Sequence, residues 1–67
     1  MIYIDRLAGK IKEKRFTQVS LAKEIGVSIT TMSLIMQGKI SIKFDNVIKI
    51  CNTLELTPEE RLDIFLS

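Results

Sequence analysis

Apolar residues recur at intervals of three and four along nearly the whole chain, which is the spacing of one face of an α-helix. Residues 21–33, LAKEIGVSITTMS, interrupt this spacing at Gly26 and resume it directly after Ser28. Glycine adopts the left-handed conformation that ends a helix without steric penalty, and serine is a good amino-terminal cap for the next helix. The stretch therefore predicts two short helices joined by a tight turn.

The same reading along the rest of the chain predicts an all-α fold, because no sustained alternation typical of strands occurs. We expect five helices, over residues 5–14, 17–25, 29–37, 44–54 and 57–67. The side chains expected in the core are Leu7, Ala8, Ile11, Leu21, Ala22, Ile25, Met32, Ile35, Phe44, Val47, Ile48, Cys51 and Leu54. With 67 residues, these helices form one domain whose core is only just large enough to fold alone.

Local signals mark several helix ends. Thr17 is a good cap for the second helix, and residues 39–42, KISI, form a connector after Gly38 stops the third. In the last helix Thr57 is the cap, Pro58 takes the first helical position and Glu60 completes a capping box. Gly9, in the interior of the first helix, suggests a close contact with another helix.

Composition argues against several classes of protein. The chain has no histidine and one cysteine, Cys51, so it can form neither an internal disulfide nor a metal cluster of the usual Cys and His spacings. No paired carboxylates, activated nucleophile or phosphate loop appears, so we expect no enzyme, no cofactor and no small-molecule substrate. Without a membrane-length apolar run or a leader pattern, we expect a cytoplasmic protein with no membrane partner.

The charges are unevenly distributed along the chain. Residues 1–52 carry nine Lys or Arg against four Asp or Glu, a balance of +5, whereas residues 53–67 carry one against four, a balance of −3. A basic body of this kind is either an ordinary solvated surface or a face that binds a polyanion. Charge alone leaves both interpretations open.

Helix, short glycine turn and helix is the geometry of the helix-turn-helix, whose second helix enters the major groove of DNA. Over residues 17–39, TQVSLAKEIGVSITTMSLIMQGK, the sequence resembles the phage repressor and Cro-like (XRE-type) helix-turn-helix regulators. The resemblance covers about residues 4–56, and the ending LTPEERLDIF resembles the last helix of small Cro-like proteins of phages and mobile elements. It implies a lambda-repressor-like domain that binds double-stranded DNA.

The resemblance assigns roles to particular side chains. The residues that would contact phosphates are Thr17, Gln18, Ser28, Gln37, Lys39 and Lys43, and those that would read bases are Ile29, Thr30, Ser33 and Leu34. Two departures from the family stand out. Lys43 replaces the usual Ser or Thr cap, which a phosphate contact or an ordinary surface lysine would explain, and Arg15 stands where Gly or Asn is common, so the first loop is expected to be strained or differently shaped.

Half of the base-reading set is apolar, which leaves two interpretations of this face. Ile29 and Leu34 can pack against thymine methyl groups, or, together with Met36, they can form a patch that binds a protein. The function predicted first is a sequence-specific transcriptional repressor that binds a palindromic operator. The alternative is a protein-interaction module, antitoxin-like or an anti-repressor, on the same scaffold.

A palindromic operator requires a homodimer, since one helix-turn-helix reads only a few base pairs. The last helix has more apolar residues than one short helix can bury against its own domain. Phe65 and Leu66 are therefore the predicted dimerisation residues. The alternative is that this tail only closes the core of the monomer.

Overall fold

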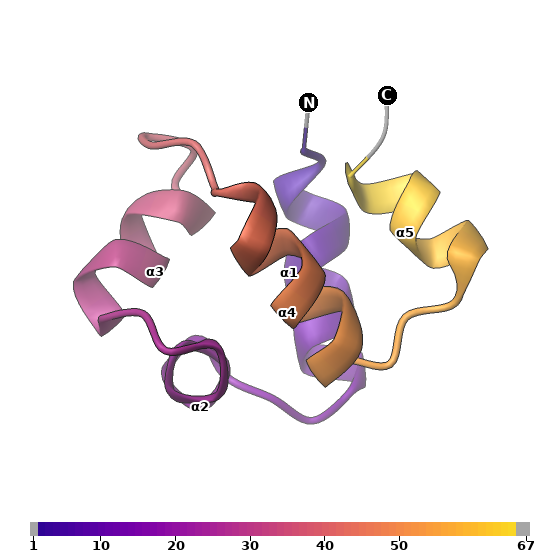
Figure 1. The fold of residues 1–67 in the computed structure, drawn as a ribbon, viewed down its shortest axis with the longest axis horizontal. Helices are drawn as coiled ribbons and strands as arrows, with labels where there is room; N and C mark the ends of the chain where they lie inside the picture. The colour runs from indigo at the N-terminus through magenta and orange to yellow at the C-terminus, as the bar shows by residue number, and fades with distance from the viewer. Residues whose placement is uncertain (1, 66–67) are drawn as a thin grey trace.

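The structure is a computed structural model that describes residues 2–65, and within this range it is all-helical. Its helices are α1 (Ile4–Glu13), α2 (Gln18–Ile25), α3 (Ile29–Met36), α4 (Phe44–Thr53) and α5 (Pro58–Phe65) (Figure 1). The predicted number and order of the helices are confirmed, and the observed ends lie within one or two residues of the predicted ones. The end of the tail, residues 66–67, lies outside the described residues.

The helices form two packed groups around one core. Helix α2 packs against both α3 and α4, while α1 packs against α5 and brings the two ends of the chain to the same side of the molecule (Figure 1). The backbone N–H of Tyr3 donates to the carbonyl of Ile64 at 2.8 Å, and Arg6 pairs with Asp63 at 2.6 Å. These contacts tie α1 to α5 across almost the full length of the sequence.

Most of the predicted core is confirmed. The buried apolar side chains are Leu7, Ile11, Leu21, Ala22, Ile25, Met32, Ile35, Ile50, Cys51, Leu54, Leu56 and Ile64. Val47 is partly buried against these side chains. Burial raises the pKa of the Cys51 thiol, which keeps the thiol protonated. Each helix therefore contributes at least one side chain to a single core.

Three residues predicted to be buried are exposed instead: Ala8, Phe44 and Ile48. On α4 the predicted row was Phe44, Val47, Ile48, Cys51 and Leu54, whereas Val47, Ile50, Cys51 and Leu54 face the core. Both rows have helical spacing and share Val47, Cys51 and Leu54, so the error is a rotation of the helix about its axis. On α1 the core-facing row of Leu7 and Ile11 turns Ala8 outward.

The predicted caps of three helices are present. Thr17 and Ser28 each accept a hydrogen bond from the backbone N–H three residues later, at 3.1 and 3.0 Å. Thr57 accepts from the N–H of Glu60 at 3.2 Å, and the Glu60 carboxylate accepts from the N–H of Thr57 at 2.9 Å. This last pair is a complete capping box, which holds the start of α5.

Helix-ending turns occur at two charged residues as well as at glycines. Arg15 has φ 66° and Glu55 has φ 52°, in the same left-handed region as Gly26 at 78° and Gly38 at 73°. A side chain in this region is strained by about 1 kcal/mol relative to glycine. The predicted strain in the first loop is thus located at Arg15.

Gly9 makes no close helix contact, contrary to the prediction, because a Cβ placed there would meet nothing within 4 Å. Gly9→Ala is therefore expected to raise the free energy of unfolding by about 1 kcal/mol, the helix-propensity difference between the two residues. Chemical denaturation followed by circular dichroism measures this change. Destabilisation by the new methyl group would contradict the open space found around Gly9.

The start of α5 also makes stability depend on pH. The Lys10 ammonium, 2.5 Å from the Glu60 carboxylate, and the backbone N–H of Thr57 lower the pKa of Glu60 from 4.5 to about 2. Since the folded-state pKa is depressed, this stabilisation is present above the unfolded pKa and is lost as pH falls from about 4.5 through about 2.

Glu60→Gln should therefore flatten the loss of stability over this acidic range, because glutamine keeps the capping box but has no carboxylate to protonate. Denaturation midpoints at a series of pH values measure the effect. Glu59→Gln is the matched control, since Glu59 is exposed and lies in no ion pair among residues 2–65. Equal effects of the two variants would contradict the assignment to Glu60.

Candidate nucleic-acid interface

Helices α2 and α3 meet at a sharp bend. Between them the chain turns by 116°, over three residues. Gly26, in the left-handed conformation, and Val27 both donate their backbone N–H to the carbonyl of Ala22, at 2.9 and 3.0 Å. These bonds end α2, and Ser28 then caps α3.

Within residues 2–65 no single helix is long and apolar enough to cross a membrane; only the bent pair of α2 and α3 reaches the required length and composition.

The predicted base-reading residues share the face of α3 that points away from the core. Met32 and Ile35 are buried, and the predicted base-reading residues occupy the other side of the helix. Ile29 is 54% exposed and Thr30 is also exposed. Ser33 and Leu34 are partly buried, so the structure brings the four predicted residues to one face but gives them unequal access to a ligand.

The apolar part of this face is smaller than predicted. Met36 packs against the core, so it does not extend the exposed apolar surface of Ile29. The hydroxyl of Ser33 accepts a hydrogen bond from the side-chain amide of Gln37 at 2.9 Å, which links a predicted base-reading residue to a predicted phosphate contact. Ile29 is thus the main apolar group that α3 offers to a partner.

The starts of α2 and α3 place further predicted contacts at the surface. Thr17, Gln18 and Ser28 are all exposed. In addition to capping, the Ser28 hydroxyl donates to the hydroxyl of Thr31 at 2.9 Å. Backbone N–H groups and the positive end of the helix dipole converge at such helix starts, where phosphate oxygens bind well.

A hollow of about 230 Å³ joins the start of α3 to the start of α4. Ser28 and Thr31 line it from α3, while Lys43 and Asn46 line it from α4. Lys43 is the residue before α4 and makes no side-chain capping bond, because an ammonium group donates hydrogen bonds and cannot accept one from the helix N–H groups. The hollow therefore combines two helix starts with one cation, a combination that suits an anion. Sequence reasoning named Ser28 and Lys43 separately but did not predict that they share one hollow.

Gln37 and Lys39 lie at the opposite end of α3 and are exposed. The N–H of Lys39 donates to the carbonyl of Leu34 at 3.0 Å, which fixes the backbone just after the helix. Arg15, at the end of α1, is exposed as well. The predicted phosphate contacts therefore flank the α3 face at both ends.

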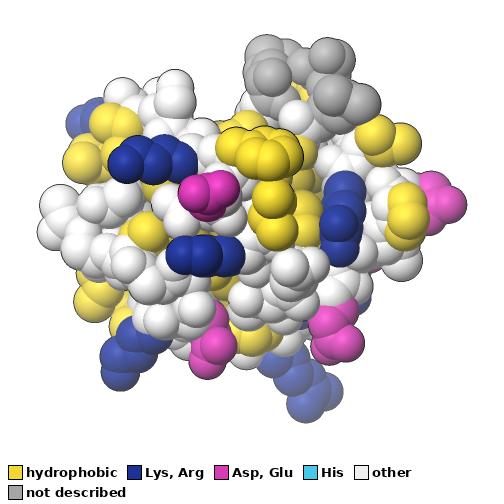
Figure 2. Space-filling view, viewed as in Figure 1, with side chains coloured by type: hydrophobic (Ala, Val, Ile, Leu, Met, Phe, Trp, Pro, Cys, Tyr) yellow, Lys and Arg dark blue, Asp and Glu magenta, His cyan; other side chains and the backbone are white. Residues whose placement is uncertain are grey.

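On the face drawn in Figure 2, the charged side chains do not form a patch of one sign. Figure 2, drawn from the same side as Figure 1, has Lys and Arg side chains interspersed with Asp and Glu over the visible face. The arrangement of caps and helix ends, rather than net charge, is what distinguishes the α3 surface.

Of the predicted dimerisation residues, Phe65 lies partly buried against the core and Leu66 lies outside the described residues. Ile64 is fully buried, so α5 does contribute to closing the core of the monomer. The exposed large apolar residue on this helix is Leu62, at 54%. The role of the tail in a dimer remains a prediction.

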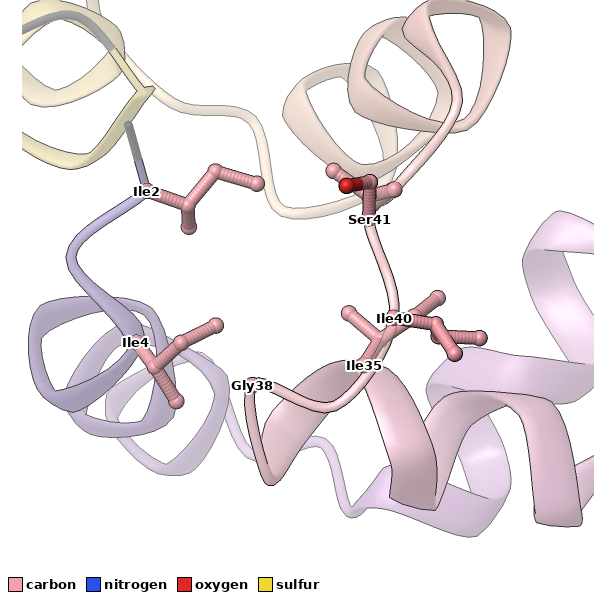
Figure 3. A pocket seen from close by; sticks show the side chains of 7 residues that line it. Ile2, Ile4, Ile35, Gly38, Ile40 and Ser41 are labelled. Carbon is pink, nitrogen blue, oxygen red and sulfur yellow. The ribbon is translucent and has the colours of Figure 1, made fainter.

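Another hollow lies between the start of α1 and the connector after α3. Its volume is about 390 Å³, and Ile2, Ile4, Ile35, Ile40 and Ser41 project around it (Figure 3). Among residues 2–65, those that line it are isoleucines, one glycine and one serine, none of which has a titratable side chain.

Sequence comparison places the whole chain in one family. Residues 1–67 match the family described as "Protein of unknown function (DUF739)". The chain belongs to this family. No curated protein matches the sequence.

Proposed function

We propose that this protein binds double-stranded DNA as a helix-turn-helix regulator similar to the small Cro-like repressors, with α3 in the major groove. The observation that carries the proposal is the 116° bend between two eight-residue helices, joined by a three-residue turn that contains Gly26. Helix-turn-helix units have crossing angles of about 90–120° and turns of about this length. The outward face of α3 supports the same proposal, because the apolar Ile29 and the polar Thr30 are exposed there and can meet base edges.

Phosphate contacts would fix the position of the protein on the duplex. The hollow that Ser28 shares with Lys43 lies at one end of α3, and Lys39 follows the other end. Thr17 and Gln18 stand at the start of α2 and would meet the same backbone. Such contacts set the register of the protein on DNA without reading sequence, which leaves specificity to α3.

Binding of the purified protein to random duplex DNA over a salt series tests the proposal. A DNA-binding protein loses affinity steeply as salt rises because phosphate contacts release counterions, with a slope of about −0.9 per contact. Absence of measurable binding at low salt would refute the proposal. Binding sites selected from a random library should be two-fold symmetric, since a homodimer of this class reads half-sites about 34 Å apart.

Thymine methyl groups are the predicted apolar landmark for Ile29, the more exposed of the two apolar base-reading residues. Replacing the facing thymine with uracil removes one methyl group and should weaken binding about fourfold, or about 0.8 kcal/mol. Titrations of a selected operator, with uracil at one position at a time, measure the loss.

Ile29→Ala should abolish the sensitivity to uracil at that one position and leave it unchanged elsewhere. Thr30→Ala is the matched control on the same helix turn. If uracil has no effect at any position, Ile29 does not read DNA, and this side chain is then better assigned to a protein partner.

A further inference from the structure

Helix α4 has an exposed apolar row that neither the core nor the proposed DNA contacts use. Phe44 is 74% exposed and Ile48, one turn later, is 43% exposed. Phe44 has the highest exposed fraction of the exposed large apolar side chains, which are Val19, Ile29, Ile40, Phe44, Ile48 and Leu62. Aromatic side chains gain more from burial than others and are enriched at interfaces between proteins.

Two charges follow this row along one edge. Asp45 and Lys49 are both exposed, stand one turn apart and lie about 100° around the helix from Phe44 and Ile48, respectively. Within residues 2–65 neither belongs to an ion pair, since the bridges found there join Arg6 to Asp63 and Lys10 to Glu13 and Glu60. We name the four residues Phe44, Asp45, Ile48 and Lys49 the α4 patch.

The order of charges in the α4 patch is complementary to itself. In a two-fold dimer the same surface meets itself. Where the two-fold axis is perpendicular to α4, the two copies of this helix run antiparallel and the same edge of each helix faces its counterpart. Because the two helices run in opposite directions, Asp45 of each copy lies opposite Lys49 of the other, so the dimer contains two such pairs. The reversed arrangement also places the Phe44–Ile48 row of each copy against that of the other.

We propose that a second copy of this chain docks on the α4 patch through antiparallel α4 helices. The inference rests on the proposed function in one respect. That function calls for a two-fold dimer, and the α4 patch is proposed as its contact surface. It differs from the sequence-based prediction, which placed the dimer contact at Phe65 and Leu66.

The dimer is expected to be weak. An interface of standard size buries about 800 Å² per partner, almost a fifth of the 4540 Å² that the chain exposes, and one helix face supplies less. Affinity in the micromolar range is therefore the expected result for the free protein.

Sedimentation equilibrium without DNA tests the proposal, so its outcome is independent of DNA binding. Phe44→Ser should weaken self-association at least about tenfold, as expected for loss of a central aromatic anchor. Leu62→Ser, a matched exposed apolar residue on α5, should leave it unchanged. Because Phe44 is exposed, Phe44→Ser should leave the fold intact, and circular dichroism of each variant verifies this.

Charge reversal gives the sharper test. Asp45→Lys and Lys49→Asp each place like charges opposite each other in a homodimer, so each variant alone should self-associate less than the parent protein. An equimolar mixture should recover association, because one copy then has two lysines facing two aspartates. Failure of the mixture to recover, a monomeric parent protein at millimolar concentration, or dissociation by Leu62→Ser in place of Phe44→Ser would each overturn the proposal.

Discussion

Ile50→Ala is expected to lower the free energy of unfolding by about 2–5 kcal/mol, enough to unfold a large fraction of so small a domain. Ile50 is fully buried, at 0% exposure, so truncation removes its contacts and leaves a cavity. Chemical denaturation followed by circular dichroism measures the loss.

Phe44→Ala is the matched control within the same helix. Because Phe44 is 74% exposed, this change should alter the free energy of unfolding by less than about 0.5 kcal/mol. A large effect at Phe44 together with a small one at Ile50 would mean that α4 is rotated about its axis, as the sequence analysis had it.

The double variant Lys39→Ala, Lys43→Ala should bind every DNA sequence more weakly, by about 60-fold for each protomer that contacts the duplex at 0.1 M salt. Each neutralised phosphate contributes a factor of about eight at that salt concentration, and the salt slope should fall by about 0.9 for each lysine. Titrations of a selected operator and of random duplex, each over a salt series, measure both quantities.

Lys12→Ala is the matched control, since Lys12 is an exposed lysine on α1, a helix that carries none of the proposed phosphate contacts. It should change the affinity and the slope little. A change in base preference at one operator position, in place of uniform weakening, would show that Lys43 or Lys39 lies in the groove and would contradict the phosphate assignment.

The features that sequence predicted best are those set by local chemistry. A cap needs one hydroxyl three residues before a backbone N–H, so Thr17, Ser28 and Thr57 could be located without any knowledge of the fold. The left-handed turn at Gly26 could likewise be located from the local sequence alone. These signals were enough to obtain the five helices in order.

The errors arose where the answer depends on tertiary packing. Phe44, Val47 and Ile48 have the helical spacing of a core-facing row, and so do Val47, Ile50 and Cys51. Which row is buried is decided by where α2 lies against α4, which the spacing within α4 does not contain. The exposure of Phe44 could therefore be found only from the assembled fold.

The candidate site divides in the same way. The outward face of α3 follows from helical spacing once Met32 and Ile35 are assigned to the core. That Ser28 and Lys43 line one hollow depends on the path of the connector, which returns the chain to the start of α3. The hydrogen bond from the side-chain amide of Gln37 to the hydroxyl of Ser33 depends on a side-chain conformation that the sequence pattern does not encode.

The pairing of α1 with α5 has a consequence for the order in which the fold assembles. Helices α2, α3 and α4 pack together within residues 18–53, whereas Tyr3 and Ile64 must close a loop of about sixty residues to form their hydrogen bond. Such a closure costs chain entropy that local contacts do not, so α2–α4 should form first and the two ends should join last. The proposed recognition surface thus lies on the segment that is expected to form first, so local opening of the two chain ends should leave this surface folded.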